Sequence, residues 1–268
     1  MSTGYITIAV GHRRFLEMAV DLALSVRAYD LRPISLVTDA PLRAALGPYR
    51  ALFDEVVMMP RELGGDRAVK FGLAELSPYT HAMYVDADCL LLDSLELAWQ
   101  AASGAPLMLV GEHLTDRDDE KHHRHSTRSL MRRFETDVYL KSNSGLVYID
   151  TRAGRDVLRE CLQFYRRTLK PALRSPLALP DELAFGVVCG RRRVPVFPQP
   201  GPMLWRDEVH ALDLASPKKP LLHLIAAPRW HTWTELQSQL RQRRLMCDVP
   251  IASRFAWEHR RFKAMFNR

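Results

Sequence analysis

Short apolar runs alternate with amphipathic segments through the first sixty residues of the chain. Residues 6–10, 34–38 and 55–59 are short, apolar and contain β-branched side chains, which predicts three strands. Between the first two, apolar side chains recur with the spacing of an amphipathic helix: Phe15, Ala19, Leu22, Val26 and Tyr29. Asp39, followed by Pro41, opens a short second helix. This β-α-β-α-β order predicts an α/β fold with a doubly wound, mostly parallel central sheet flanked by helices.

The same two patterns continue along the chain. Further strands are expected at residues 81–85, 106–110, 146–150, 194–197 and 221–225. Helices are expected where apolar side chains repeat with helical spacing: around Val69, Leu73 and Leu76, from Val157 to Leu169, and over residues 181–190, where Gly190 ends the helix.

Two polar stretches interrupt these elements. Residues 112–136 include a histidine tract, His122, His123 and His125. Because the tract has no fixed metal-ligand spacing, we interpret it as a mobile, solvated loop, although a long polar insertion can also be a lid or an acceptor-binding loop. Residues 171–180 are interpreted as a proline-broken loop.

The strand at residues 81–85 ends in two carboxylates. Asp86 and Asp88 follow it directly, and side chains two apart on an extended chain point to the same side. Two carboxylates so close repel each other unless a cation lies between them, and hard oxygen ligands suit Mg²⁺ or Mn²⁺ bound together with substrate phosphates. We therefore interpret the pair as a divalent-metal site for a phosphorylated ligand at the carboxyl end of a central strand.

Two alternatives are open for this acidic pair. An acidic pair after a strand is often a solvated loop or a helix cap, and Asp93 has capping-box spacing to Glu96. An Asp-x-Asp loop whose first aspartate is a nucleophile occurs in phosphatases and phosphotransferases. That loop usually follows the first strand, whereas several predicted strands precede Asp86.

Other candidate binding residues lie on both sides of the pair. Arg67 and Lys70 are spaced i, i+3 at a predicted helix start, which suits diphosphate binding, although such pairs are commonly a solvated basic face. Asn143 precedes Gly145 and a buried strand, where it is either a turn residue or a hydrogen-bonding group for a substrate. Asp181 stands at a helix start, and a capping role alone would explain it.

Composition narrows the class of protein. The 268 residues suffice for one large α/β domain or two small ones, and 47% hydrophobic residues is ordinary for a globular protein. No apolar run approaches the ~20 residues that span a bilayer, and the N-terminus does not resemble a signal peptide. The 4 cysteines are widely spaced, as reduced core residues are, so we expect a cytoplasmic protein.

The formal charge of +7 favours anionic partners, among them phosphates, acidic polymers and an anionic membrane face. The basic residues are scattered and no zinc-finger, Walker-type or dinucleotide-binding fingerprint is found, so a nucleic acid is not expected as a partner. Residues 239–268 mix arginines with aromatic side chains. They are interpreted either as a membrane-surface helix or as a terminal helix packed on the domain.

Five motifs occur in an order known from one enzyme family. They are Arg67-x-x-Lys70, Asp86-Ala87-Asp88, Asn143-Ser144-Gly145, Asp181-Glu182 and the late His223. In this order they resemble the family-8-type glycosyltransferases, which include glycogenin and bacterial lipopolysaccharide glucosyl- and galactosyltransferases. The resemblance runs from about residue 6 to residue 231. It implies a GT-A fold, which we expect over residues 1–238, followed by a basic, aromatic tail at 239–268.

The resemblance implies roles for these residues. Asp86, Asp88 and His223 would hold Mn²⁺ or Mg²⁺ against the diphosphate of a nucleotide-sugar, which is UDP-linked in most of the family. The donor-binding set is expected to comprise Ala9, Val10, Arg67, Lys70, Val85, Asp86, Ala87 and Asp88. Asn143 would line the sugar site and Asp181 would hydrogen-bond sugar hydroxyls. Glu182 falls where the family often has Gln beside the anomeric carbon.

Three departures from the family pattern stand out. Residues 11–14 replace the acidic, nucleotide-reading segment usual after the first strand, Asp-Glu replaces Asp-Gln, and residues 226–231 only echo the pattern that follows the metal histidine. We expect a metal-dependent glycosyltransferase with a glycan, lipid-linked or protein acceptor, cytoplasmic or peripheral on the inner face of the membrane. The alternatives are a sugar-nucleotidyltransferase, which normally has a Gly-rich basic loop after the first strand, and a catalytically silent domain that binds nucleotide-sugars or glycans.

Overall fold

The computed structural model describes residues 2–63, 67–173, 179–204 and 216–223. The chain divides into two compact units, Met1–His223 and Leu224–Arg268, and every described residue belongs to the first. The aromatic tail at 239–268 and the domain boundary expected before it lie outside the described residues, as do residues 226–231. Both expectations therefore stay predictions.

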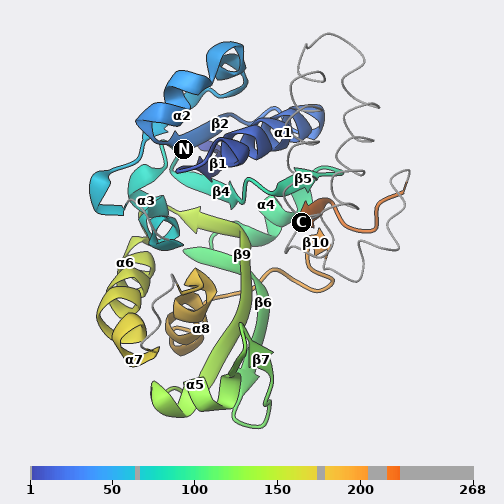
Figure 1. Cartoon of the computed structure of the whole chain (residues 1–268). Helices are drawn as coiled ribbons and strands as arrows, with labels where there is room; N and C mark the ends of the chain where they lie inside the picture. The colour runs from blue at the N-terminus through green and yellow to red at the C-terminus, as the bar shows by residue number, and fades with distance from the viewer. Residues whose placement is uncertain (1, 64–66, 174–178, 205–215, 224–268) are drawn as a thin grey trace, which may run out of the picture. The chain divides into compact units, whose positions relative to one another are not determined.

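A six-stranded sheet forms the centre of the first unit (Figure 1). Its strands, in spatial order, are β3 (Glu55–Met58), β2 (Ile34–Thr38), β1 (Thr3–Ala9), β4 (His81–Val85), β9 (Val138–Asp150) and β6 (Leu107–Thr115). The first four are mutually parallel, and β9 runs antiparallel to both β4 and β6. The expected α/β fold with a mostly parallel central sheet is confirmed.

Helices connect and flank these strands. The α-helices are α1 (Arg13–Tyr29), α2 (Ala40–Ala45), α3 (Leu73–Leu76), α4 (Glu96–Ala102), α5 (Thr127–Arg133), α6 (Arg155–Phe164), α7 (Lys170–Leu173) and α8 (Asp181–Arg191). Shorter helical turns are η1 (Gly47–Leu52), η2 (Arg61–Leu63) and η3 (Arg67–Gly72), and η4 (Tyr165–Leu169) joins α6 to α7 as a π-helical turn. The Asp39 side chain accepts a hydrogen bond from the Leu42 amide and so caps α2, as the sequence predicted.

Two local predictions about helices were wrong. The stretch around Val69 is mainly the 3₁₀ turn η3, and only the four residues of α3 are α-helical. Asp93 does not cap α4, because that helix begins at Glu96, whose amide donates to the Ser94 hydroxyl. The Asp93 carboxylate instead accepts from the Ser94 amide. The capping-box spacing therefore placed the start of α4 too early in the sequence.

Helix α8 approaches β9 closely because two glycines face the strand. A Cβ at Gly186 would lie 2.5 Å from the Tyr139 hydroxyl oxygen, and one at Gly190 would lie 2.9 Å from the Tyr139 Cα. On its other side α8 meets Phe71 of η3, whose ring centroid is 4.9 Å from that of Phe185. Burial of these aromatic side chains fixes α8 against β9 and η3. The first residues of α8 are thereby held at the middle of β9.

The polar stretch at 112–136 has regular structure, which corrects its interpretation as a loop. Strand β6 continues to Thr115, β7 (Lys121–His122) and β8 (His125–Ser126) form a hairpin, and α5 follows. Strand β9 then includes Ser142–Gly145, which had been expected to precede the strand at 146–150, and its register with β6 is irregular there. In Figure 1 the paired β6 and β9 extend together toward the hairpin and α5.

A second, three-stranded sheet holds the last described residues. Strand β11 (Leu221–His223) lies between β10 (Met203–Leu204) and β5 (Cys89–Leu91) and pairs antiparallel with β5, so that His223 faces Cys89 across the ladder. The strand predicted at 194–197 is reduced to a single bridge between Val196 and Leu109. The small sheet thus joins a late segment of the unit to the stretch that follows the acidic pair.

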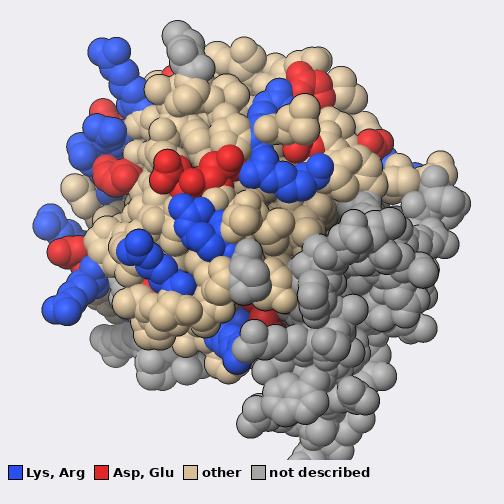
Figure 2. Space-filling view, turned by 90° about the horizontal axis from the view of Figure 1, so that it is seen from above, with Lys and Arg blue, Asp and Glu red and all other residues tan. Residues whose placement is uncertain are grey.

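The charged side chains on the surface and the state of the cysteines can be compared with what the composition predicted. On the face that Figure 2 presents, lysine and arginine side chains are interspersed with acidic ones. Among the described helices, none has both the length and the apolar character needed to cross a membrane. Cys89, Cys161 and Cys189 are buried and free, as predicted for reduced core residues, and Cys247 lies outside the described residues.

Candidate active site

The acidic pair lies where three segments meet: the end of β4, the middle of β9 and the end of β11. The Asp86 amide donates to the Gly145 carbonyl of β9 over 2.9 Å, and the Cys89 amide donates to the Asp86 carbonyl over 2.9 Å. The second bond closes a turn over Asp86–Cys89. The chain is therefore not extended across Ala87, contrary to our expectation. The turn still brings both carboxylates toward one imidazole.

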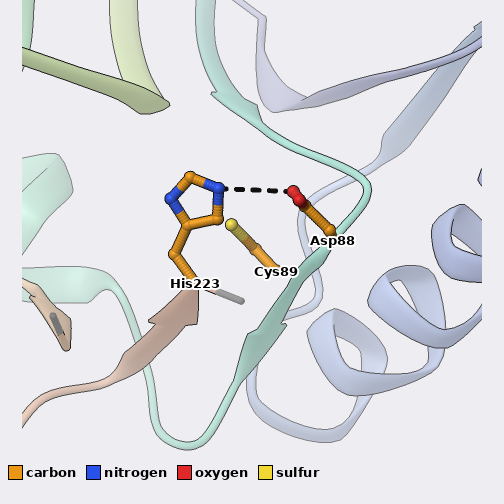
Figure 3. A group of neighbouring side chains, drawn as sticks. All are labelled: Asp88, Cys89 and His223. Carbon is orange, nitrogen blue, oxygen red and sulfur yellow. Dashed lines mark ion pairs between the residues drawn. The ribbon is translucent and has the colours of Figure 1, made fainter. Parts of the chain in front are cut away.

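That imidazole belongs to His223, which is only 7% exposed. Its Nε2 lies 3.3 Å from an Asp88 carboxylate oxygen and 3.7 Å from an Asp86 oxygen. Figure 3 shows the His223 ring directed at Asp88, with the Cys89 sulfur beside both, and one donor atom from each of these three side chains lies within 4.8 Å of the others. The structure thus brings together the three residues expected to bind a metal.

These residues fit a divalent ion. Donor atoms around one ion at bond lengths of about 2.1 Å lie about 3 Å apart, and the separations of His223 Nε2 from Asp88 and Asp86, 3.3 Å and 3.7 Å, are near this value. Two carboxylates suit Mn²⁺ and Mg²⁺ alike, and the imidazole favours Mn²⁺ over the harder Mg²⁺. Within the described residues the buried Nδ1 of His223 has no hydrogen-bond partner, so the ring is oriented by packing and by the carboxylates.

Charges in this group depend on one another. Burial disfavours ionisation of Asp88, but the His223 charge and hydrogen bond outweigh it and lower the pKa of Asp88. Burial likewise opposes protonation of His223, but the two carboxylates, Asp88 first, raise its pKa. The pKa of Asp86 is raised, mainly by burial and then by the like charge of Asp88, against the opposing effect of Lys70. The group is therefore a partly buried cluster, with the Asp86 and Asp88 side chains 19% and 35% exposed, in which positive charge is needed beside the carboxylates.

Lys70 supplies a fixed positive charge next to the acidic pair. Its ammonium nitrogen lies 2.9 Å from Asp86 Oδ2, 2.9 Å from the Ser144 hydroxyl and 3.5 Å from Asp181 Oδ2. Burial would lower the pKa of Lys70, but the charges of Asp181 and Asp86 raise it well above the usual value. The alternative of a solvated basic face is thus wrong for Lys70. Of Arg67 the structure describes only the backbone.

Ser144 connects the acidic pair to the start of α8. Its hydroxyl donates to Asp181 over 2.7 Å, and its amide donates to Glu182 Oε1 over 3.2 Å. Asp181 therefore does not cap its helix, where Pro180 is the cap residue. Sequence reasoning quoted Ser144 within a motif but gave it no role. Only the strand pairing that brings β9 beside β4 could have revealed its position.

Asn143 lies in β9 rather than in a turn. Its side-chain oxygen accepts from the Gly145 amide over 2.8 Å and would lie 2.9 Å from a Cβ at Gly145. The same Cβ would lie 2.5 Å from His223 Nδ1. Gly145 therefore lets the histidine approach the strand, and Asn143 borders this contact. The role that the resemblance implies for Asn143 at the sugar stays a prediction.

The remaining predicted donor-binding residues, Ala9, Val10, Val85 and Ala87, have apolar side chains and lie near the carboxyl end of β4. Ala9 ends β1, which pairs in parallel with β4, so Ala9 and Val10 lie near the end of β4. Val85 and Ala87 flank Asp86 and are buried. The Gly11 amide donates to the Asp39 carboxylate over 2.6 Å, which ties the segment after β1 to the end of β2.

A residue that sequence reasoning left in a solvated loop also reaches the site. His123, at the tip of the β7–β8 hairpin, pairs through Nε2 with Glu182 Oε2. Burial opposes ionisation of Glu182, but the His123 hydrogen bond and charge lower its pKa to about 2. The histidine tract was the available signal. Its contact with Glu182 depends on the hairpin, which the polar pattern did not predict.

The fold defines the class: the chain has the GT-A fold of glycosyltransferases. An active-site Gln-to-Glu mutant of LgtC matches with a TM-score of 0.64 and 13% identity, over 92% of this chain and 97% of that one. The galactosyltransferase LgtC with donor and acceptor sugar analogues matches with a TM-score of 0.60 and 13% identity over the same shares. Mouse xyloside xylosyltransferase 1 matches with a TM-score of 0.54 and 12% identity, over 84% and 98%. No protein-family model matches the chain, and no curated protein matches it in sequence.

Proposed function

We propose that this protein is a metal-dependent glycosyltransferase that moves a sugar from a nucleotide-diphospho-sugar, UDP-linked, to a glycan, lipid-linked or protein acceptor. One observation carries the proposal. A three-residue donor set, a buried ammonium group and the carboxylates at the start of α8 converge at one edge of the sheet. Open α/β sheets bind ligands at that edge.

Asp86, Asp88 and His223 would hold the ion. Bound there, Mn²⁺ or Mg²⁺ would offset the negative charge that develops on the leaving diphosphate. Lys70 adds a cation that is already ordered by three polar neighbours and needs no rearrangement to act on an anion. A buried, preorganised charge of this kind contributes more than an exposed one.

Asp181 and Glu182 would face the transferred sugar. Both are ionisable groups held by hydrogen bonds to Ser144, and Glu182 is also held by His123. Carboxylates stabilise the oxocarbenium-like sugar in related chemistry and can also act as nucleophile or base. The fold likeness to a galactosyltransferase crystallised with donor and acceptor sugar analogues supports a donor-plus-acceptor reaction.

The test is donor turnover by the full chain. A panel of UDP-sugars is incubated with and without Mn²⁺, and release of UDP is measured for the wild type and for Asp88→Asn. We expect metal-dependent release by the wild type and a loss of at least about 100-fold in the variant, because one electrostatic contributor is removed. Asp93→Asn, an exposed acidic change a few residues away, is the matched control and should leave release unchanged.

Three outcomes would contradict the proposal. Wild-type activity in Asp88→Asn would refute the metal assignment. Release of pyrophosphate from a nucleoside triphosphate and a sugar phosphate would identify a nucleotidyltransferase. Tight calorimetric binding of UDP-sugars without turnover under any divalent ion would identify a binding domain.

Contact of residues 239–268 with an anionic membrane stays a separate prediction, which vesicle co-sedimentation at low and high salt can test.

A further inference from the structure

The β7–β8 hairpin has a two-residue turn of unusual composition. His122 pairs with His125, so His123 and Arg124 are the two turn residues, and their φ angles are 48° and 72°. Positive φ at both positions is typical of a type I′ turn, which favours Asn and Gly, and His is among the few other residue types enriched at positive φ. The turn therefore places His123 at the tip of the hairpin, where its side chain reaches Glu182.

His122 anchors the hairpin to the site. It is buried, its Nδ1 lies 2.8 Å from the Tyr139 hydroxyl, and its Nε2 lies 3.1 Å from the Ser142 carbonyl. Since a carbonyl oxygen only accepts, Nε2 carries the hydrogen and Nδ1 accepts from Tyr139. Burial and the neighbouring His123 lower the pKa of His122 to about 4, so this ring is neutral near pH 7. The hairpin is therefore fixed to β9 two residues before Ser144.

The geometry does not favour a second metal site here, although His122, His123 and Glu182 lie within 4.8 Å of one another. Both ring nitrogens of His122 are already used by Tyr139 and Ser142. Ligation of an ion would break one of these buried hydrogen bonds. The cluster is better described as an anchor, His122, that presents a neighbouring imidazole, His123, to a carboxylate.

Glu182 is held at both of its oxygens. Oε1 accepts the Ser144 amide of β9, and Oε2 faces His123 Nε2 of the hairpin. The Glu182 side chain is 13% exposed and that of His123 is 33% exposed. Lys70, His122 and Tyr139 also interact electrostatically with Glu182. The carboxylate is thus fixed between two elements, with the more open side formed by His123.

We propose that His123 is a positioning residue that fixes the orientation of the Glu182 carboxylate and links the β7–β8 hairpin to the active centre through this one side chain. The inference rests on the proposed function for its catalytic consequence, but the pairing itself can be measured without turnover. Substitution of His123 should release Oε2 while the Ser144 bond to Oε1 remains. Glu182 would then rotate, and turnover would fall more than donor affinity.

The first measurement reads the pairing directly. Protein labelled with ¹³C at glutamate carboxyl carbons is titrated by NMR, and Glu182 is assigned from the signal lost in Glu182→Gln. The variant is His123→Asn, because Asn tolerates positive φ and preserves the turn. We expect the pKa of Glu182 to move from about 2 in the wild type to at least one unit higher in the variant. Arg124→Asn, at the other turn position, should leave the Glu182 titration unchanged.

The second measurement reads the consequence. For the donor that the wild type turns over, His123→Asn should lower kcat by about tenfold or more and should leave KM for the donor within about twofold. The reason is that displacing a group in the active site by about 1 Å can lower the rate on the order of 100-fold. Arg124→Asn should retain wild-type kcat. A changed Glu182 titration together with the kcat loss supports the inference.

The two proposals fail in different ways. An unchanged Glu182 titration in His123→Asn overturns the pairing, whatever the kinetics. A changed titration with unchanged kcat overturns the positioning role. If the wild type turns over no donor, the proposed function fails, and the NMR titration alone decides whether His123 fixes Glu182.

Discussion

Gly145→Ala tests whether His223 belongs to a metal site. The added Cβ would lie 2.5 Å from both Cε1 and Nδ1 of His223 and 2.9 Å from the Asn143 side-chain oxygen, whereas ordinary contacts begin at 3.4 Å. The imidazole must therefore retreat by about 1 Å if the backbone of Gly145, in the middle of β9, stays in place. The Asp86 amide is bonded to the Gly145 carbonyl, which limits movement on that side too.

Two effects of this substitution can be separated. Overpacking of a buried site costs roughly 1–3 kcal/mol of unfolding free energy. A ligand displaced from its position loses about 10- to 100-fold in metal affinity, or about 1.4–2.7 kcal/mol of binding free energy. Calorimetric titration with Mn²⁺ measures the affinity, and urea unfolding without metal measures the stability. Both should change in Gly145→Ala.

Gly201→Ala is the matched control for this experiment. Gly201 is also buried, but an added Cβ there would meet only Val110 Cγ1 at 3.7 Å, which is an ordinary contact. It should retain wild-type Mn²⁺ affinity and nearly wild-type stability. The reasoning is refuted if Gly145→Ala loses stability yet binds Mn²⁺ as tightly as the wild type, because His223 would then have moved without consequence for the ion.

Three further predictions concern charge and stability. Lys70→Met removes the cation between the Asp86 and Asp181 carboxylates and should lower the unfolding free energy by about 3 kcal/mol. Added Mn²⁺ should restore part of this loss. A loss under about 1 kcal/mol in urea unfolding would contradict the prediction. Burial opposes ionisation of Glu182, but His123 lowers its pKa from the ordinary 4.5 to about 2. The ionised carboxylate therefore stabilises the fold by about 3 kcal/mol at pH values above 4.5, and this contribution disappears as the pH falls toward 2. Unfolding measured between pH 5 and pH 2.5 should therefore show a smaller decline in Glu182→Gln than in the wild type, and parallel declines would disprove the assignment. Tyr5→Phe removes a hydroxyl that accepts from Trp99, far from the site, and should cost about 1–2 kcal/mol of stability with no change in donor turnover.

Local patterns predicted the parts of the fold that depend on neighbouring residues. Strand β2 was predicted at its observed bounds, and the cap of α2 by Asp39 was predicted from sequence alone. Strand β9 was not predicted as one element, because Ser142–Gly145 is polar and contains glycine. Pairing of Ser142 and Asn143 with β6, and the bond from the Asp86 amide to the Gly145 carbonyl, hold this stretch in the sheet. Tertiary context overrode a weak local preference there.

The candidate site also has parts that the sequence predicted and parts that it did not. The Asp86–Asp88 pair and the start of α8 were visible as motifs, whereas the contacts among them depend on pairings between distant segments. Lys70 and Ser144 are 74 positions apart and meet only because η3 packs beside α8 and β9 beside β4. His123 reaches Glu182 only because its hairpin is fixed to β9 through His122. No periodicity encodes such contacts.

The place of β11 in the chain has a consequence for biosynthesis. A nascent polypeptide that has not yet emerged from the ribosome beyond Leu221 contains both aspartates of the site but lacks the imidazole, since β11 pairs with β5 from a much earlier part of the sequence. The proposed metal site can close only after almost the whole first unit has been synthesised and folded. Affinity for a divalent ion should therefore arise late and abruptly in a series of stalled translation intermediates, and would report completion of this unit during synthesis.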